Sequence, residues 1–241
     1  MPAEIEMVQL VAFVSGAPTD NANTLWSRLF SDPLSNFSTM GQITVATGLT
    51  NGIQLQLHVQ PTRFDIIATG ASPQDLPPNF PPSLQDFEAT LALMRPPFDK
   101  ICSENGAVRL ACVVQTHEQA VSESDASTKI GAAIQLNVKP NSGDVTFQIN
   151  VKKASYQQPG LDINRLCRWS TASIMMMPFP LQGNPAGLNV PIGGAPVWVS
   201  NVYIDVNTTA GIPISTGNIP KLTDELIQEA KNILEGGYAY L

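Results

Sequence analysis

Hydrophobic and polar side chains alternate along much of this chain, which is the pattern of strands that bury one face. The alternation is clearest over residues 53–60, where Ile53, Leu55, Leu57 and Val59 are separated by polar residues. The same pattern predicts further strands over residues 5–14, 42–47, 63–69, 108–116, 130–138, 145–153 and 197–206.

A short turn sequence connects two of these segments. Asn51-Gly52 lies between residues 42–47 and 53–60, and Asn-Gly is the favoured dipeptide of a two-residue hairpin turn because both residues tolerate a positive φ. With residues 63–69, these segments are expected to form an antiparallel meander.

Four other segments carry apolar residues at helical spacing. The first helix is introduced by the capping-prone run Asp20, Asn21, Asn23 and Thr24, and its apolar stripe is Leu25, Trp26, Leu29 and Phe30. The second follows Ser83 and ends at Pro96-Pro97. A third is expected over residues 162–174, and a closing helix with Thr223 as its N-terminal cap. Residues 122–128 are interpreted as a flexible connector.

These elements predict an α+β fold, with antiparallel sheets of hairpins and meanders flanked by about four amphipathic helices. Alternation with polar outer faces argues against a buried parallel sheet. The 241 residues divide near residue 100, into an N-terminal half (1–100) and a C-terminal half (101–241) that can pack as one domain. Residues 53–61 resemble residues 134–140. This likeness has two interpretations, a duplication of the halves or the general similarity of alternating strands.

Charge and cysteine content narrow the class of protein. Only 14% of the residues are charged, and 13 basic against 20 acidic residues give a net charge of -7. Broad nucleic-acid binding and a polybasic membrane contact are therefore disfavoured. The sequence has no apolar stretch long enough for a membrane helix, and residues 1–16 carry no basic residue that a signal peptide would need. With three scattered cysteines, we expect a cytoplasmic protein.

The chain lacks the common signatures of nucleotide, zinc, dithiol and serine-nucleophile sites, so a non-enzymatic role is favoured, with no cofactor and no metal. One group of ionisable residues is a weak catalytic candidate. A turn at Pro61-Thr62 would place His58 opposite Asp65, next to Arg63, where a carboxylate orients an imidazole for general-base work. The alternative is a solvated ion pair.

Two other features predict a surface that binds a partner. The outward positions of the expected strands carry amides instead of charges, at Gln54, Gln56, Gln135 and Asn137. The segment 175–181 has consecutive apolar side chains, of which Met176, Met177, Phe179 and Leu181 are candidate anchors. The alternative for that segment is packing in the protein's own core.

We therefore expect a non-enzymatic protein–protein interaction or assembly protein, which associates with itself or joins a hetero-complex. The alternative is a ligand-binding or hydrolytic domain with a cleft between the two halves around His58 and Asp65, closed by the loop at residues 182–196.

Overall fold

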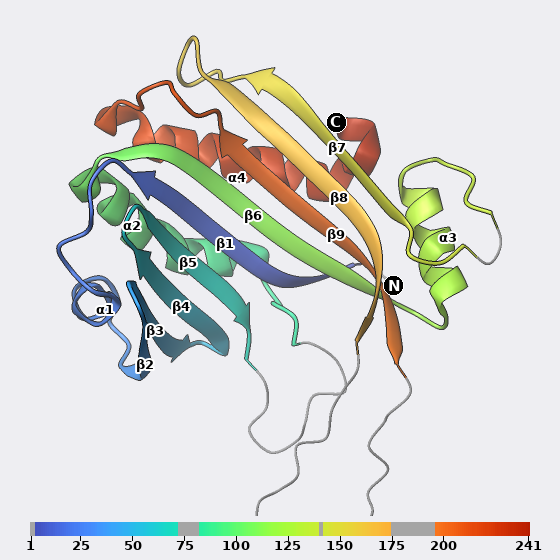
Figure 1. Cartoon of the computed structure of the whole chain (residues 1–241), viewed down its shortest axis with the longest axis horizontal. Helices are drawn as coiled ribbons and strands as arrows, with labels where there is room; N and C mark the ends of the chain where they lie inside the picture. Colours follow the sequence, from blue (N-terminus) through green and yellow to red (C-terminus); the bar gives the residue numbers. More distant parts are fainter. Residues whose placement is uncertain (1–2, 72–81, 140–141, 175–195) are drawn as a thin grey trace, which may run out of the picture.

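One antiparallel sheet of nine strands organises the part of the chain that this computed structural model describes, residues 3–71, 82–139, 142–174 and 196–241 (Figure 1). The strands stand in the order β2-β3-β4-β5-β1-β6-β9-β8-β7, and all neighbouring pairs are antiparallel. Their bounds are β1 Glu4–Val14, β2 Leu34–Met40, β3 Ile43–Thr50, β4 Ile53–Gln60, β5 Arg63–Gly70, β6 Ala107–Ala120, β7 Thr146–Ala154, β8 Asp162–Ile174 and β9 Val197–Thr208.

The four α-helices of the described residues pack on one face of this sheet. In Figure 1, α2 and α4 cross behind the central strands, α1 lies beside β2 and β3, and α3 lies near β8 and β9. Side chains from all four helices and from the sheet form one core. The bounds are α1 Ala22–Leu29, α2 Phe87–Asn105, α3 Glu123–Ala133 and α4 Ile219–Gly236, with 3-10 turns at Thr216–Asn218 and Gly237–Tyr240.

Alternation along the strands decides which side chains enter this core. In β1, Val8, Leu10 and Ala12 are fully buried beneath the helices. Val11 points to the opposite face, which we call the open face, where it forms a small separate cluster with Ala111 and Val113. The predicted α+β class, with antiparallel strands and four helices, is confirmed for the described residues.

The structure contradicts the helix predicted over residues 162–174. This segment is strand β8, which pairs with β9 along its whole length. Ile163, Cys167 and Trp169 alternate into the core, but Arg165 occupies the position between them and is also buried. A charged residue at an inward position hid the period of two from sequence analysis.

The predictions for residues 122–138 are also wrong. Residues 122–128, predicted to be a connector, instead form the cap and the first part of helix α3. The cap is Ser122, whose side chain accepts a hydrogen bond from the backbone N–H of Asp125 at 3.1 Å. The strand predicted over residues 130–138 is absent, because α3 continues to Ala133 and Gln135 then adopts φ +58°. Gln135 and Asn137 therefore do not lie on a sheet.

The predicted boundaries of two helices need correction. Helix α2 is capped by Asp86 instead of Ser83, and it continues through Pro96 and Pro97. Met94, Phe98 and Ile101 are fully buried along its length, and this burial outweighs the hydrogen bonds that the prolines remove. Helix α4 begins at Ile219, so the predicted cap Thr223 lies inside it and donates its hydroxyl hydrogen to the Ile219 carbonyl.

Both halves of the chain run strand, short helix, antiparallel strands and long helix. The halves meet where β1 pairs with β6 in the middle of the sheet. The predicted boundary at residue 100 falls within α2, and the division into 1–100 and 101–241, like the duplication, stays a prediction.

Two buried carboxylates of α4 attach this helix to β7, β8 and the turn that follows β7. Glu225 accepts hydrogen bonds from the Ser155 hydroxyl at 2.6 Å and from the Tyr156 backbone N–H at 2.9 Å. Glu229 bonds Lys153 Nζ at 2.5 Å and Arg165 Nη1 at 3.4 Å. The buried charge of Arg165 on β8 is thus matched by a buried carboxylate on the helix.

Glu229→Ala would leave the Arg165 guanidinium buried without its carboxylate. We expect this change to lower the free energy of unfolding by about 3–5 kcal/mol, measured by urea denaturation. The double variant Arg165→Leu/Glu229→Leu should lose less stability than Glu229→Ala, because no unpaired charge is then buried. Equal losses in the two variants would contradict this role for the pair.

Candidate functional site

The predicted ionisable residues lie on the open face, on strands β4 and β5. His58 and Asp65 are directly opposite across these strands, as the predicted turn required. The Asp65 carboxylate is only 1% exposed. It accepts hydrogen bonds from Arg63 Nη2 at 2.7 Å and from Gln9 Nε2 at 2.9 Å. Asp65 is therefore engaged by the guanidinium and by an amide of β1.

His58 has a different hydrogen-bond partner. Its Nε2 atom lies 3.0 Å from Gln56 Oε1 on the same strand. Burial lowers the pKa of the His58 imidazole from its usual 6.5; the nearby Asp65 carboxylate acts in the opposite direction, and Arg63 lowers the pKa further. The imidazole is consequently neutral at pH 7, and Arg63 occupies the carboxylate that would orient it as a general base.

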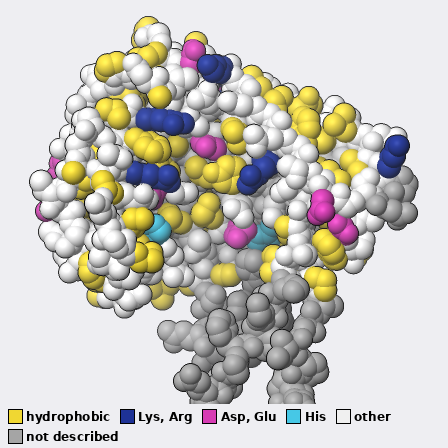
Figure 2. Space-filling model, viewed as in Figure 1, with side chains coloured by type: hydrophobic (Ala, Val, Ile, Leu, Met, Phe, Trp, Pro, Cys, Tyr) yellow, Lys and Arg dark blue, Asp and Glu magenta, His cyan; other side chains and the backbone are white. Residues whose placement is uncertain are grey.

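The open face also groups Arg63 with residues that sequence analysis did not select. The guanidinium groups of Arg63 and Arg109 both lie over the Phe13 ring, with Cζ 5.3 and 5.4 Å from the ring centroid. Arg109 Nη2 also donates to Asn207 Oδ1 at 2.8 Å. Figure 2 shows this face, where basic side chains stand among hydrophobic and acidic ones near the middle of the sheet. No sequence signal indicated the grouping of Phe13, Arg63 and Arg109, because these residues lie on three strands far apart in the chain.

The predicted partner-binding residues fall into three groups. Gln54 and Gln56 are half-buried on the open face of β4, next to Leu49 and Thr47 of β3. Gln135 and Asn137 are on the irregular segment after α3. The predicted apolar anchors lie outside the described residues and stay a prediction; they are Met176, Met177, Phe179 and Leu181. The predicted loop at residues 182–196 also lies outside them, except for Pro196.

The cysteines are core residues and provide no nucleophile. Cys102, Cys112 and Cys167 are free and buried. Burial raises the pKa of the Cys112 and Cys167 thiols to about 12, and raises that of Cys102 as well. All three are thiols at neutral pH.

The two edges of the sheet differ in a way that bears on binding. Strand β2, at one edge, has no charged side chain, and six of its seven residues are exposed. Phe37 is 39% exposed and Met40 64%, and Leu49 of the adjacent β3 is 51% exposed. Strand β7, at the other edge, carries Lys152 and Lys153. Lysines protect an edge against pairing with another chain, so of the two edges in the described part of the sheet only β2 is an unprotected apolar one.

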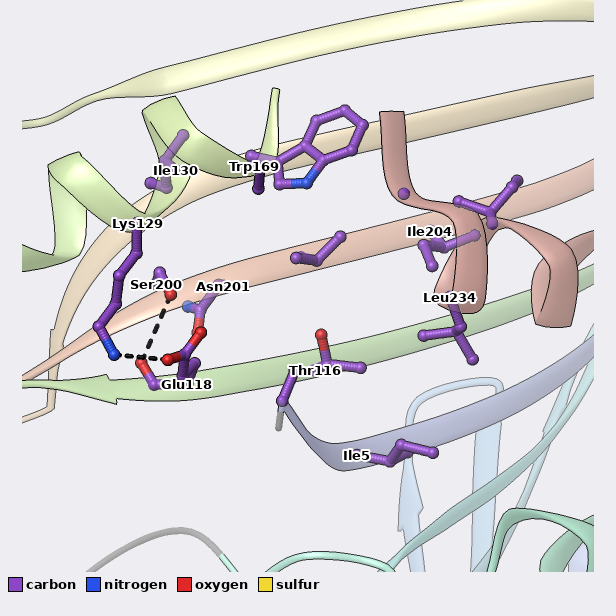
Figure 3. Close-up of a pocket in the computed structure, with 15 residues that line it drawn as sticks. Ile5, Thr116, Glu118, Lys129, Ile130, Trp169, Ser200, Asn201, Ile204 and Leu234 are labelled. Carbon is purple, nitrogen blue, oxygen red and sulfur yellow. Dashed lines mark hydrogen bonds and ion pairs between the residues drawn. The ribbon is translucent and has the colours of Figure 1, made fainter. Parts of the chain in front are cut away.

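A pocket of about 390 Å³ lies on the helix-covered side, between α3, α4 and strands β1, β6, β8 and β9 (Figure 3). Ile130 of α3, Trp169 of β8 and Leu234 of α4 contribute apolar walls. At one end of the pocket, Lys129 Nζ lies 2.5 Å from Glu118 Oε1. No sequence signal could locate this pocket, because its walls come from the start of the chain and from both ends of the C-terminal half.

Comparisons of the chain with protein-family models, curated proteins and solved structures found no match. Within the described ranges, no cluster of three or more His, Cys, Asp or Glu side chains could hold a metal ion. None of the described helices has the length and hydropathy to cross a membrane. Function is therefore inferred from the geometry of this chain alone.

The lowered pKa of His58 predicts a dependence of stability on pH. The unfolded chain binds a proton at His58 near pH 6.5, whereas the folded chain does so only at lower pH. The contribution of neutral His58 to the free energy of unfolding is therefore complete above pH 6.5. It is lost as the pH falls below 6.5 toward the lower pKa of the folded chain. We expect wild type to lose more thermal stability between pH 7.5 and about 5.5 than His58→Gln does. Equal losses, measured by circular dichroism melts, would contradict this account.

Proposed function

We propose that this protein is a non-enzymatic assembly protein that joins two copies of itself through strand β2. The observation that carries the proposal is the unprotected edge: β2 is exposed and uncharged, and it lies beside the exposed Leu49. An edge strand offers unpaired backbone N–H and C=O groups to an incoming strand. Association would satisfy these groups and bury the exposed apolar side chains.

The sequence of β2 is complementary to itself, so a second copy of the chain can pair with this edge. Two antiparallel β2 strands related by a two-fold axis form an isologous interface, in which the same residues serve both copies. A pairing centred on Phe37 sets Phe37 opposite its equivalent and Asn36 opposite Ser38, so that aromatic meets aromatic and polar meets polar. No charge of β2 has to lose its hydration.

The predicted amides fit this arrangement as its polar margin. Gln54 opposes Leu49 across the β3–β4 pair, and Gln56 opposes Thr47. Both amides lie on the open face two strands from the edge. Phe37 pairs with the buried Ala46 and so faces the helix-covered side; the amides therefore border the part of the contact that Leu49 makes on the open face. There they can form hydrogen bonds without introducing an unpaired charge.

A cytoplasmic location is part of this proposal. The three thiols are buried and unpaired among the described residues, which supports a protein that folds without disulfides in the reducing cytoplasm.

Adding like charges to β2 tests the proposal. In Asn36→Lys/Ser38→Lys, lysines of the two copies would stand directly opposite and repel each other. We expect wild type to be a dimer in sedimentation equilibrium and this variant to be a monomer with a similar melting temperature, because both side chains are exposed.

The matched control is Gln148→Lys/Asn150→Lys, which adds the same charge at two exposed positions of the other edge, β7. This control should remain a dimer. A monomeric wild type, or a β2 variant that still dimerises, would overturn the proposal.

A further inference from the structure

We infer that the pocket between the sheet, α3 and α4 binds a small, uncharged and mostly apolar molecule. The strands that line the pocket are β1, β6, β9 and β8, which are separated from β2 by β3, β4 and β5. Its ligand would therefore not compete with the assembly edge, and this inference does not depend on the proposed dimer.

The walls of the pocket are apolar and come from rigid elements. Ile130 projects from α3, Leu234 from α4, and Trp169 and Ile204 from neighbouring strands (Figure 3). Trp169 is held in place by Phe147, whose ring centroid is 5.8 Å away, and by the edge of Tyr238 at 6.2 Å. Apolar walls fixed by packing of this kind favour a ligand with a large apolar surface.

The polar groups of the pocket set the charge of the ligand. Lys129 and Glu118 form an ion pair at one end, and Lys129 Nζ also donates to the Gln119 carbonyl at 2.9 Å. Their charges cancel, so a charged ligand would lose its hydration without gaining a counter-charge. The Thr116 hydroxyl, on β6, points into the pocket beyond this pair (Figure 3) and suits one hydrogen bond from a neutral polar group.

The size of the pocket excludes a bulky occupant. A volume of about 390 Å³ lies near the lower end of the range for small-molecule sites, about 300–1,000 Å³. An α-helix with its side chains is about 10–12 Å across and would not fit without displacing α3 or α4. The occupant is thus a single small molecule.

Two dyes with one ring system test both parts of the inference. N-phenyl-1-naphthylamine is uncharged, and 8-anilinonaphthalene-1-sulfonate is the same molecule with a sulfonate. We expect the neutral dye to bind wild type saturably, with increased fluorescence, and the anionic dye to bind at least about tenfold more weakly. If the neutral dye does not bind, or the anionic dye binds equally well, the inference is overturned.

A pair of variants locates the binding. Ala133 lines the pocket at the end of α3, whereas Ala132, which is also exposed, does not. Ala133→Phe should narrow the pocket and weaken binding of the neutral dye by about tenfold or more. Ala132→Phe should bind the dye with the affinity of wild type. Leu234→Trp narrows the pocket from α4 and should repeat the loss. Equal binding by all these variants would show that the dye binds elsewhere.

Discussion

All four helices in the described ranges pack against the same face of one long sheet, and the other features of the molecule follow from this one-sided packing. Each strand needs an apolar row only on the covered face, so the open face is free to carry Arg63, Asp65, Arg109 and the amides of β4. The sheet is also not closed, so it has two edges. The chain protects one edge with lysines and leaves β2 without charge.

The elements with local signals could be predicted from the sequence. Asn51-Gly52 forms the expected turn with positive φ at both residues, and the strands on either side pair in the register that the sequence required. Helix α1 is capped by Asn21, whose side chain accepts from the Thr24 backbone N–H at 2.9 Å. In each case the interaction is made within a few residues, and the pattern of residue types therefore reports it.

The elements that failed depend on partners far away in the chain. Arg165 can be buried because Glu229, on the last helix, lies within 3.4 Å of it. This partner cannot be recognised from the sequence of residues 162–174, so the pattern of that segment predicts a helix. Strand β2 is exposed, and among the described strands it pairs with β3 alone; its sequence therefore has no alternation of apolar residues from which a strand could be predicted. For the same reason, the most informative features for function, the edge and the pocket, could not be found from the sequence. The His58 and Asp65 register could be, but the contact of Asp65 with Gln9 of β1 could not.

The central claim is that β2 acquires a partner strand when two copies meet. The most direct measurement is hydrogen exchange of the β2 backbone amides at two protein concentrations about a hundredfold apart, because mass action favours the dimer at the higher one. The account predicts slower exchange at residues 34–40 in the concentrated sample and unchanged exchange along β7. Identical exchange of β2 at both concentrations, in a protein that is monomeric throughout, would contradict it.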